Sequence, residues 1–211
     1  MPRSSQGEWA AAAGRSDPID LLIESNHALV PELVPIRYGR MATSPLAFLR
    51  GSALLMAYDL SGRPVTGIKT QICGDAHLSN FGLFATPERN VIFDVNDFDE
   101  TLRGPWEWDL KRLAASSFVA ARDNGLRRKE ARSIARESAH AYRCEMHELA
   151  RLGYLDVWYS RIDVRKALER RGGVKVPLAM RLLQRFPVLR RIPARLVGVG
   201  VRPEHVRVPS A

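Results

Sequence analysis

The sequence predicts a mostly helical α+β fold in which a short β-hairpin carries the functional residues. Two long segments after residue 105 have apolar residues at helical spacing. Two short runs at 81–84 and 90–93 are rich in branched and aromatic residues and flank a turn around Thr86–Arg89, as expected for two strands of a hairpin. The length of 211 residues suits one domain of ordinary to large size.

The N-terminal part of the chain predicts a short helix followed by an extended stretch. Residues 1–16 are rich in Ser, Ala and Gly, so we expect a flexible segment. Asp17 can cap a helix over 18–29 that has proline at its first position. Pro31 and Pro35 then predict an extended stretch.

The next elements are one helix and three strands. Ser44 followed by Pro45 predicts a helix start, and the apolar stripe continues to a stop near Ser61–Gly62, with Gly51 inside the helix for close packing. Residues 65–73 predict a strand, which precedes the two hairpin strands.

The C-terminal part of the chain predicts helices. The first runs over 106–123, where Asn124–Gly125 supplies a stop signal, and the second over 128–152. The residues expected to face inward on the second helix are Ile134, Ala135, Tyr142, Met146 and Leu149. Weaker patterns predict helices over 164–171 and 177–185, separated by a Gly172–Gly173 break. We expect one domain over 17–200 and an irregular tail over 201–211.

Composition excludes several classes of protein. With 45% hydrophobic and 26% charged residues, the chain resembles a globular protein and not a disordered or collagen-like one. No apolar run approaches the roughly 20 residues that span a bilayer, and residues 1–18 do not resemble a secretory signal. Cys73 and Cys144 fit no metal or redox spacing. We therefore expect a cytoplasmic protein with no membrane-spanning segment and no disulfide scaffold.

Positive charge is concentrated in the C-terminal part of the chain. Residues 126–211 carry 20 Lys and Arg against 8 Asp and Glu, whereas residues 1–125 carry 12 against 15. Such a region can bind nucleic acid or an anionic surface. Its arginines are interleaved with apolar residues and no nucleic-acid-binding module accompanies them, which favours a solvated helix face over a nucleic-acid site. The arginines concerned include Arg181, Arg185, Arg190, Arg191 and Arg195.

Two polar loops after predicted strands carry the candidate chemistry. The first, Gly74–Gly82, contains Asp75 and Asn80, and the second, Asp94–Glu100, contains four acidic residues. An Asp and an Asn five positions apart, with a second acidic loop nearby, can support magnesium-dependent phosphoryl transfer. One carboxylate orients an attacking hydroxyl, while hard oxygen ligands hold the ion.

The Gly-Asp-x-His-x-x-Asn pattern of residues 74–80 resembles the catalytic loop of the protein-kinase-like superfamily, especially its aminoglycoside and choline phosphotransferase branch. Asp97 and the Asp109-Leu110 pair that opens a helix reinforce the resemblance. Over residues 35–200 the chain is also similar to a bacterial family catalogued only as a domain of unknown function. The resemblance implies a kinase-like catalytic lobe that uses Mg²⁺ and ATP to phosphorylate a hydroxyl of a small molecule or a protein.

The resemblance also implies roles for individual residues. Asp75 corresponds to the catalytic base, Asn80 to a metal ligand and Asp97 to the principal metal carboxylate, while Asp94 and Asp99 compete with Asp97 for that role. Asp109 corresponds to a structural residue that ties its helix to the catalytic loop. The residues that hold the nucleotide are not identified, and the sequence indicates neither the acceptor nor an oligomeric state.

One departure from the family pattern supports an alternative function. Residues before Gly74 do not show the combination of a Gly-rich phosphate loop and a following strand that carries the nucleotide lysine. The resemblance implies that these elements follow the Val197–Gly200 segment in a permuted order, yet the chain stops at Ala211. We therefore expect a truncated member, with a non-catalytic fragment or binding module as the alternative.

The remaining polar and aromatic residues have simpler interpretations. His77 is expected to be a structural donor to the backbone, and His140 and His147 to be surface residues. A calcium loop over the second acidic stretch fails at Phe98, where an oxygen ligand is needed. A two-metal hydrolase or a glycosidase pair accounts for neither Asn80 nor Asp109. Trp106 and Trp108 are expected to pack against the adjacent loop.

Overall fold

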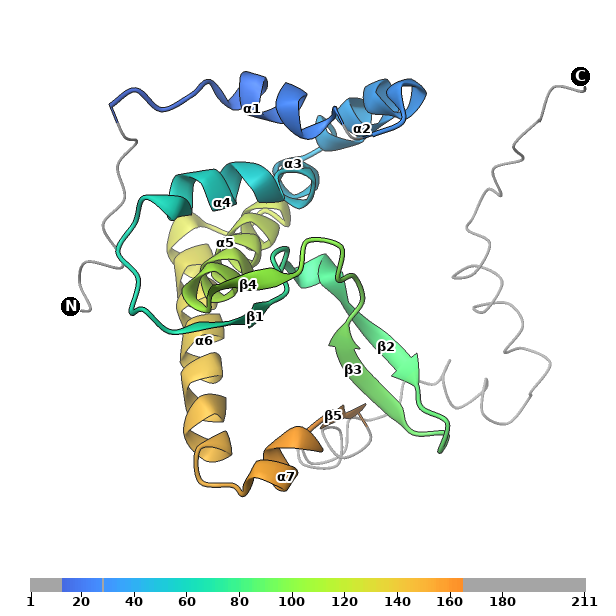
Figure 1. The fold of residues 1–211 in the computed structure, drawn as a ribbon, viewed down its shortest axis with the longest axis vertical. Coiled ribbons are helices and arrows are strands. Elements are labelled where there is room, and N and C mark those ends of the chain that lie inside the picture. The colour runs from blue at the N-terminus through green and yellow to red at the C-terminus, as the bar shows by residue number, and fades with distance from the viewer. Residues whose placement is uncertain (1–12, 28, 165–211) are drawn as a thin grey trace, which may run out of the picture. The chain divides into compact units, whose positions relative to one another are not determined.

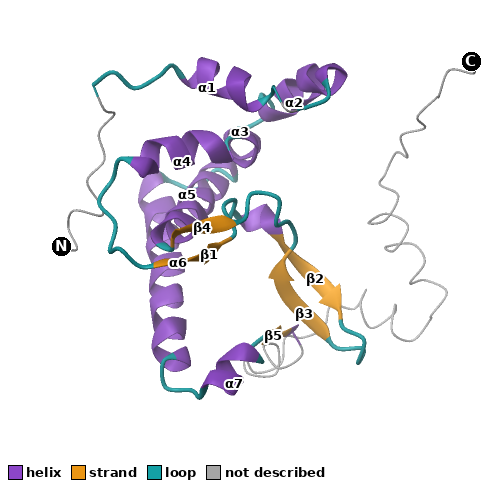
Figure 2. Cartoon of the chain, viewed as in Figure 1, coloured by secondary structure: helices purple, strands orange, loops and turns teal. Residues whose placement is uncertain are grey.

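The computed structural model describes residues 13–27 and 29–164 (Figure 1). The chain divides into two units, Met1–Ile162 and Asp163–Ala211, and nearly all described residues belong to the first. Its secondary structure is mixed α+β, with helices and two small antiparallel sheets (Figure 2), which confirms the predicted class. The predictions made for residues 165–211 lie outside the described residues, as does the Val197–Gly200 segment.

The first helices show how proline acts at a helix start. Helix α1 (Pro18–Ser25) begins where predicted, because the Asp17 carboxylate accepts a hydrogen bond of 2.7 Å from the Ile19 amide. The predicted extended stretch is wrong, because it forms a 3₁₀ turn, η2 (Pro31–Leu33), and helix α2 (Val34–Met41). Each proline stands in the first turn of its helix, where its missing N–H removes no hydrogen bond.

The single helix predicted after Ser44 is in fact two helices. Helix α3 (Pro45–Gly51) starts at Ser44, whose hydroxyl accepts from the Ala47 amide at 3.1 Å, and helix α4 (Ala53–Ser61) follows after a break at Ser52. Gly51 does permit close packing, since a Cβ there would lie 2.5 Å from the Met41 Cγ. The buried cluster at this end comes from α1, α2 and α4 and consists of Leu21, Leu22, Met41 and Leu55, with Tyr38 packed against it.

The strands form two separate sheets. Strand β1 (Lys69–Ile72) is shorter than predicted and pairs with β4 (Leu102–Pro105), a strand that the sequence did not predict because its Gly-Pro end is typical of a turn. Strands β2 (Phe81–Ala85) and β3 (Val91–Val95) form the predicted hairpin, with Leu83 opposite Phe93. A two-residue strand, β5 (Ile162–Asp163), completes the order β2-β3-β5.

Two long antiparallel helices follow β4 and pack against each other (Figure 1). Helix α5 (Glu107–Asp123) ends as predicted, with Asn124 as its cap and Gly125 at φ +81°. Helix α6 (Arg128–Leu149) ends three residues earlier than predicted, and helix α7 (Tyr154–Trp158) follows it. Two of the α6 residues predicted to face inward, Ile134 and Met146, are exposed instead.

The start of α5 is anchored by an aromatic contact. The Trp106 indole stacks on Tyr142 of α6, with ring centroids 5.7 Å apart, and its N–H donates to the Thr66 hydroxyl at 3.0 Å. The Thr66 contact agrees with the packing against a loop predicted for Trp106, whereas the ring itself packs on a helix. Within the described ranges, none of the helices combines the length and the hydrophobicity needed to cross a membrane.

Candidate functional site

The loop between β1 and β2 is held against the start of α5 by Asp109. Its carboxylate accepts hydrogen bonds from the backbone amides of Cys73, at 2.7 Å, and Gly74, at 3.0 Å. The loop continues through Asp75 and His77 into a 3₁₀ turn, η3 (Leu78–Asn80). The predicted role of Asp109, to tie its helix to this loop, is confirmed.

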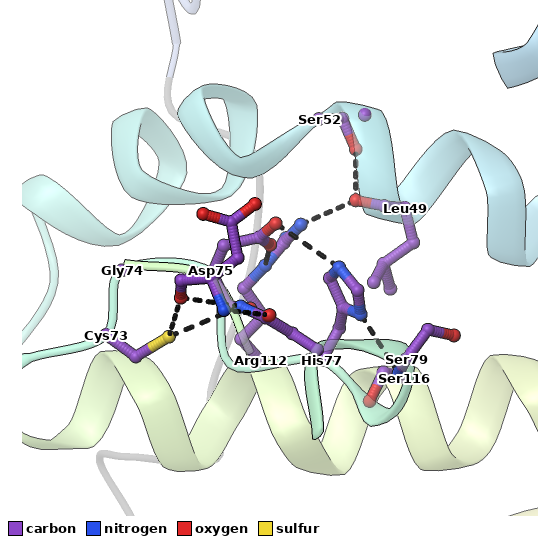
Figure 3. Close-up of polar contacts among 12 residues, drawn as sticks. Leu49, Ser52, Cys73, Gly74, Asp75, His77, Ser79, Arg112 and Ser116 are labelled. Carbon is purple, nitrogen blue, oxygen red and sulfur yellow. Dashed lines mark hydrogen bonds and ion pairs between the residues drawn. The ribbon is translucent and has the colours of Figure 1, made fainter. Parts of the chain in front are cut away.

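The carboxylate of Asp75 lies between two donors (Figure 3). Its Oδ1 accepts a short hydrogen bond from Arg112 Nε, and its Oδ2 lies 3.3 Å from His77 Nε2. The Asp75 side chain is only 12% exposed. Burial raises the pKa of Asp75, but the His77 hydrogen bond and the Arg112 charge outweigh it and hold this pKa below its usual value. Asp75 is therefore an ionised acceptor in a nearly closed environment.

His77 has a different role from the one predicted. Its Nδ1 accepts a hydrogen bond of 3.1 Å from the Ser79 amide, so the ring proton lies on Nε2, which faces Asp75 (Figure 3). His77 is thus an acceptor from the backbone and a donor to a carboxylate, not a donor to the backbone. Because the ring is almost completely buried, this arrangement fixes its orientation.

Arg112 is the site residue that sequence reasoning missed. Its side chain is 3% exposed, and besides Asp75 it binds the carbonyl of Leu49 at the end of α3, with a distance of 2.6 Å from Nη2 (Figure 3). The available signal was its spacing, because Arg112 follows Asp109 by three positions and therefore lies near it on the same helix face. A charged residue that lies among apolar residues on a helix face is expected to bind a buried group of opposite charge, because charged side chains are rarely buried unless they are paired.

Asn80 joins the two predicted loops. Its Nδ2 donates to the carbonyls of Asp75 and Asp97, both at 3.1 Å, and its Oδ1 accepts from the Asp97 amide at 2.9 Å. The Asn96 amide adds a bond of 3.0 Å to the Asn80 carbonyl. The structure therefore brings the Asp75 loop and the Asp97 loop together through a buried amide.

The predicted metal carboxylates lie in different surroundings. Asp97 is exposed beside Asn80, and its Oδ1 accepts from the Asp99 amide at 3.1 Å. Asp94 is an exposed residue of β3 opposite Gly82, and its carboxylate accepts from the Val95 amide at 2.8 Å. Among residues 13–27 and 29–164, no group of three or more His, Cys, Asp or Glu side chains is placed to hold a metal ion.

Glu100 extends the acidic surroundings of the site. Burial raises its pKa, and the negative charges of Asp75 and Asp97 raise it further. The sequence pattern predicted no role for this residue. Cys73, at the entrance to the loop, also has its pKa raised, first by burial, so its thiol favours the protonated form.

Replacing Glu100 with glutamine is expected to stabilise the protein at neutral pH by less than about 1 kcal/mol, because solvent screens a partly exposed group. A carboxyl with a raised pKa in the folded state binds its proton more tightly there than in the unfolded chain. Wild type should therefore lose stability relative to Glu100→Gln as pH rises from about 4.5 through the raised pKa. Urea unfolding at several pH values measures this difference, and a pH-independent difference would contradict it.

Comparison with known proteins identifies one related family. The sequence model of a family described as an uncharacterised protein conserved in bacteria (DUF2252) matches residues 29–185. No curated protein and no solved structure matches the chain. The matched range includes both loops of the candidate site, together with Asp109 and Arg112. This match confirms the expected similarity to a bacterial family of unknown function.

Proposed function

We propose, on the premise that this chain belongs to the DUF2252 family of uncharacterised bacterial proteins, that it has a kinase-like phosphotransferase site. In this proposal Mg²⁺ and ATP are used to phosphorylate a hydroxyl of a small molecule or a protein. Asp75 accepts the hydrogen bond of the attacking hydroxyl, and Asn80 and Asp97 hold the ion. The helices around the site form a kinase-like catalytic lobe.

The bonding of Asn80 is the observation that carries the proposal. Its amide contacts the backbone of both Asp75 and Asp97, so the residues proposed as base, metal ligand and metal carboxylate belong to one hydrogen-bonded unit. Phosphoryl transfer depends mainly on the positioning of the reacting groups and on neutralisation of the phosphate charge. A hydrogen-bonded unit of this kind positions the base relative to the metal ligands. Asp109 supports the same unit from α5.

The donor set fits Mg²⁺ that is shared with phosphate. Magnesium takes hard oxygen ligands and is commonly held by one or two carboxylates together with substrate phosphates and waters. The Asn80 Oδ1 uses one lone pair for the Asp97 amide and has a second available, while the exposed Asp97 carboxylate keeps an oxygen beyond the one that accepts from Asp99. Bound there, the ion would neutralise phosphate charge.

The chain's own residues would act on the hydroxyl. An ionised carboxylate has about four acceptor positions, and Arg112 and His77 together use two of those on Asp75. A remaining position can accept the hydrogen bond of an acceptor hydroxyl and direct its oxygen toward phosphate.

A second candidate function is a non-catalytic module that binds ligands. Arg112 and His77 contact the two oxygens of the Asp75 carboxylate. This favours the second function, because a carboxylate in a buried ion pair can have a purely structural role. The two functions differ in turnover. A binding module would take up Mg²⁺ and ATP without Asp75-dependent hydrolysis or transfer.

The proposed function predicts magnesium-dependent binding of ATP that depends on Asp97. Calorimetric titration of the full chain with ATP and Mg²⁺ should show about tenfold weaker binding for Asp97→Asn, because one carboxylate ligand is lost. Asp94→Asn tests the alternative ligand, and Asp20→Asn, an exposed residue of α1, is the surface control. Unchanged affinity in Asp97→Asn with weaker binding in Asp94→Asn would transfer the metal role to Asp94.

Turnover separates the two candidate functions. We expect slow ATP hydrolysis by wild type that falls about 100-fold in Asp75→Asn, because asparagine cannot take up a proton. Circular dichroism shows whether the variant is folded. Equal hydrolysis by wild type and Asp75→Asn would remove Asp75 from the reaction, and tight binding with no hydrolysis by either would establish the binding module.

A further inference from the structure

Arg112 connects α5 with α3, with the loop after β1 and with α4, where its Nη1 lies 3.8 Å from the Met56 sulfur. It belongs to α5, its Nε donates to the Asp75 carboxylate in the loop after β1, and its Nη2 donates to the Leu49 carbonyl at the end of α3. The guanidinium is a planar group, so two bonds in different directions determine its orientation. With a side-chain exposure of 3%, it is shielded from competing water.

The Asp75 carboxylate is consequently held from two sides. Arg112 binds Oδ1, and the Nε2 of His77 faces Oδ2 (Figure 3). His77 is itself oriented by the Ser79 amide, and Arg112 by the Leu49 carbonyl. Both donors therefore have a second contact that fixes them, and rotation of the carboxylate about χ2 would break one bond or the other.

We propose that Arg112 is a positioning residue, which together with His77 sets the orientation of the Asp75 carboxylate toward an acceptor hydroxyl. The inference rests on the proposed function, because only there does Asp75 act on a substrate. It goes beyond that function by assigning part of the turnover to a residue that touches neither nucleotide nor acceptor. Displacement of a reacting group by about 1 Å can lower a rate about 100-fold.

Arg37 provides a matched control. Its Nη2 donates to the Gly51 carbonyl at 2.8 Å, so it also binds the last turn of α3, and the hydrogen bond that the structure gives its side chain is to α3 and not to Asp75. Arg37→Gln and Arg112→Gln therefore both remove an arginine that stabilises the same helix end. They differ in the loss of the contact with Asp75.

The experiment compares hydrolysis of ATP in the presence of Mg²⁺ by the full chain and its variants. Arg112→Gln should lower kcat about 100-fold and change the KM for ATP less than about threefold, because the positioning of Asp75 affects turnover and not nucleotide binding. Arg37→Gln should change both less than about threefold. Arg112→Lys, which keeps the charge without the planar fork, should recover part of the lost turnover.

A double variant distinguishes positioning from general loosening of the structure. In the Asp75→Asn background, single-turnover assays should show less than about a threefold further loss from Arg112→Gln, since no base remains to be oriented. Losses that multiply, or equal losses in Arg112→Gln and Arg37→Gln, would overturn the positioning role while the proposed function stands. If wild type neither binds nor hydrolyses ATP with Mg²⁺, the proposed function fails and this inference with it. Should Arg112→Gln not fold, Arg112→Lys carries the same comparisons.

Discussion

Arg112→Leu is expected to lower the free energy of unfolding by about 3–5 kcal/mol, because it leaves the buried carboxylate of Asp75 without its charged partner. The change also removes a donor from the Leu49 carbonyl, at 2.6 Å in the structure. Among the described residues, the side-chain donor that would then remain to this carboxylate is His77, 3.3 Å from Oδ2. Urea unfolding followed by circular dichroism measures the loss.

The double variant Arg112→Leu/Asp75→Leu is the control for this prediction. Replacing both members of a buried ion pair removes the charge that would otherwise be left without a partner, so this protein should be more stable than Arg112→Leu alone. The comparison separates the energetic cost of an unpaired charge from the loss of packing. An unfolding midpoint for Arg112→Leu equal to that of wild type would show that the ion pair contributes nothing to stability.

The second large effect is expected at Gly74, in the loop before Asp75. Its φ of +81° is strained for any side chain, and a Cβ built there would overlap the carbonyl oxygen of Glu100 and lie 2.9 Å from the Glu100 Cβ. Left-handed strain of about 1–2 kcal/mol adds to a steric cost of about 1–3 kcal/mol, so Gly74→Ala should destabilise the protein by about 2–5 kcal/mol.

Gly125 is a matched control because its backbone has the same φ of +81° and a Cβ there meets no atom of the described part of the chain within 4 Å. Gly125→Ala should therefore cost only the strain of about 1–2 kcal/mol. The difference between the losses of unfolding free energy in the two variants measures the steric cost of a Cβ between the Asp75 loop and the Asp97 loop. Equal losses in the two variants would show that the two loops can separate without cost.

Local chemistry explains why part of the fold was predictable. The starts of α1 and α3 depend on side chains that cap amides two or three positions away, as Asp17 and Ser44 do. The hairpin of β2 and β3 depends on a turn between neighbouring runs, and the end of α5 on Asn124 and Gly125. All these signals lie within a few residues of the feature that they determine.

Other elements depend on partners that are distant in sequence. Strand β4 is a strand because it pairs with β1, about 30 positions earlier, and its own residues resemble a turn. Helices α3 and α4 are separated at Ser52, although the apolar pattern of the sequence continues across this residue. The two prolines at 31 and 35 are compatible with an extended chain or a helix start, and the structure adopts the helix start.

The sequence by itself predicted the α+β class and the two polar loops, because residue type and spacing within short segments indicate such features, and its resemblance to a kinase-like loop pointed to Asp75, Asn80, Asp97 and Asp109. Only the tertiary structure decided which groups contact Asp75. Arg112 lies 37 positions from Asp75 and 63 from Leu49, and these three meet because α5 packs beside α3 and the loop after β1. Buried ion pairs form where burial removes water from both charges, which is a property of the packed chain and not of any short segment of it.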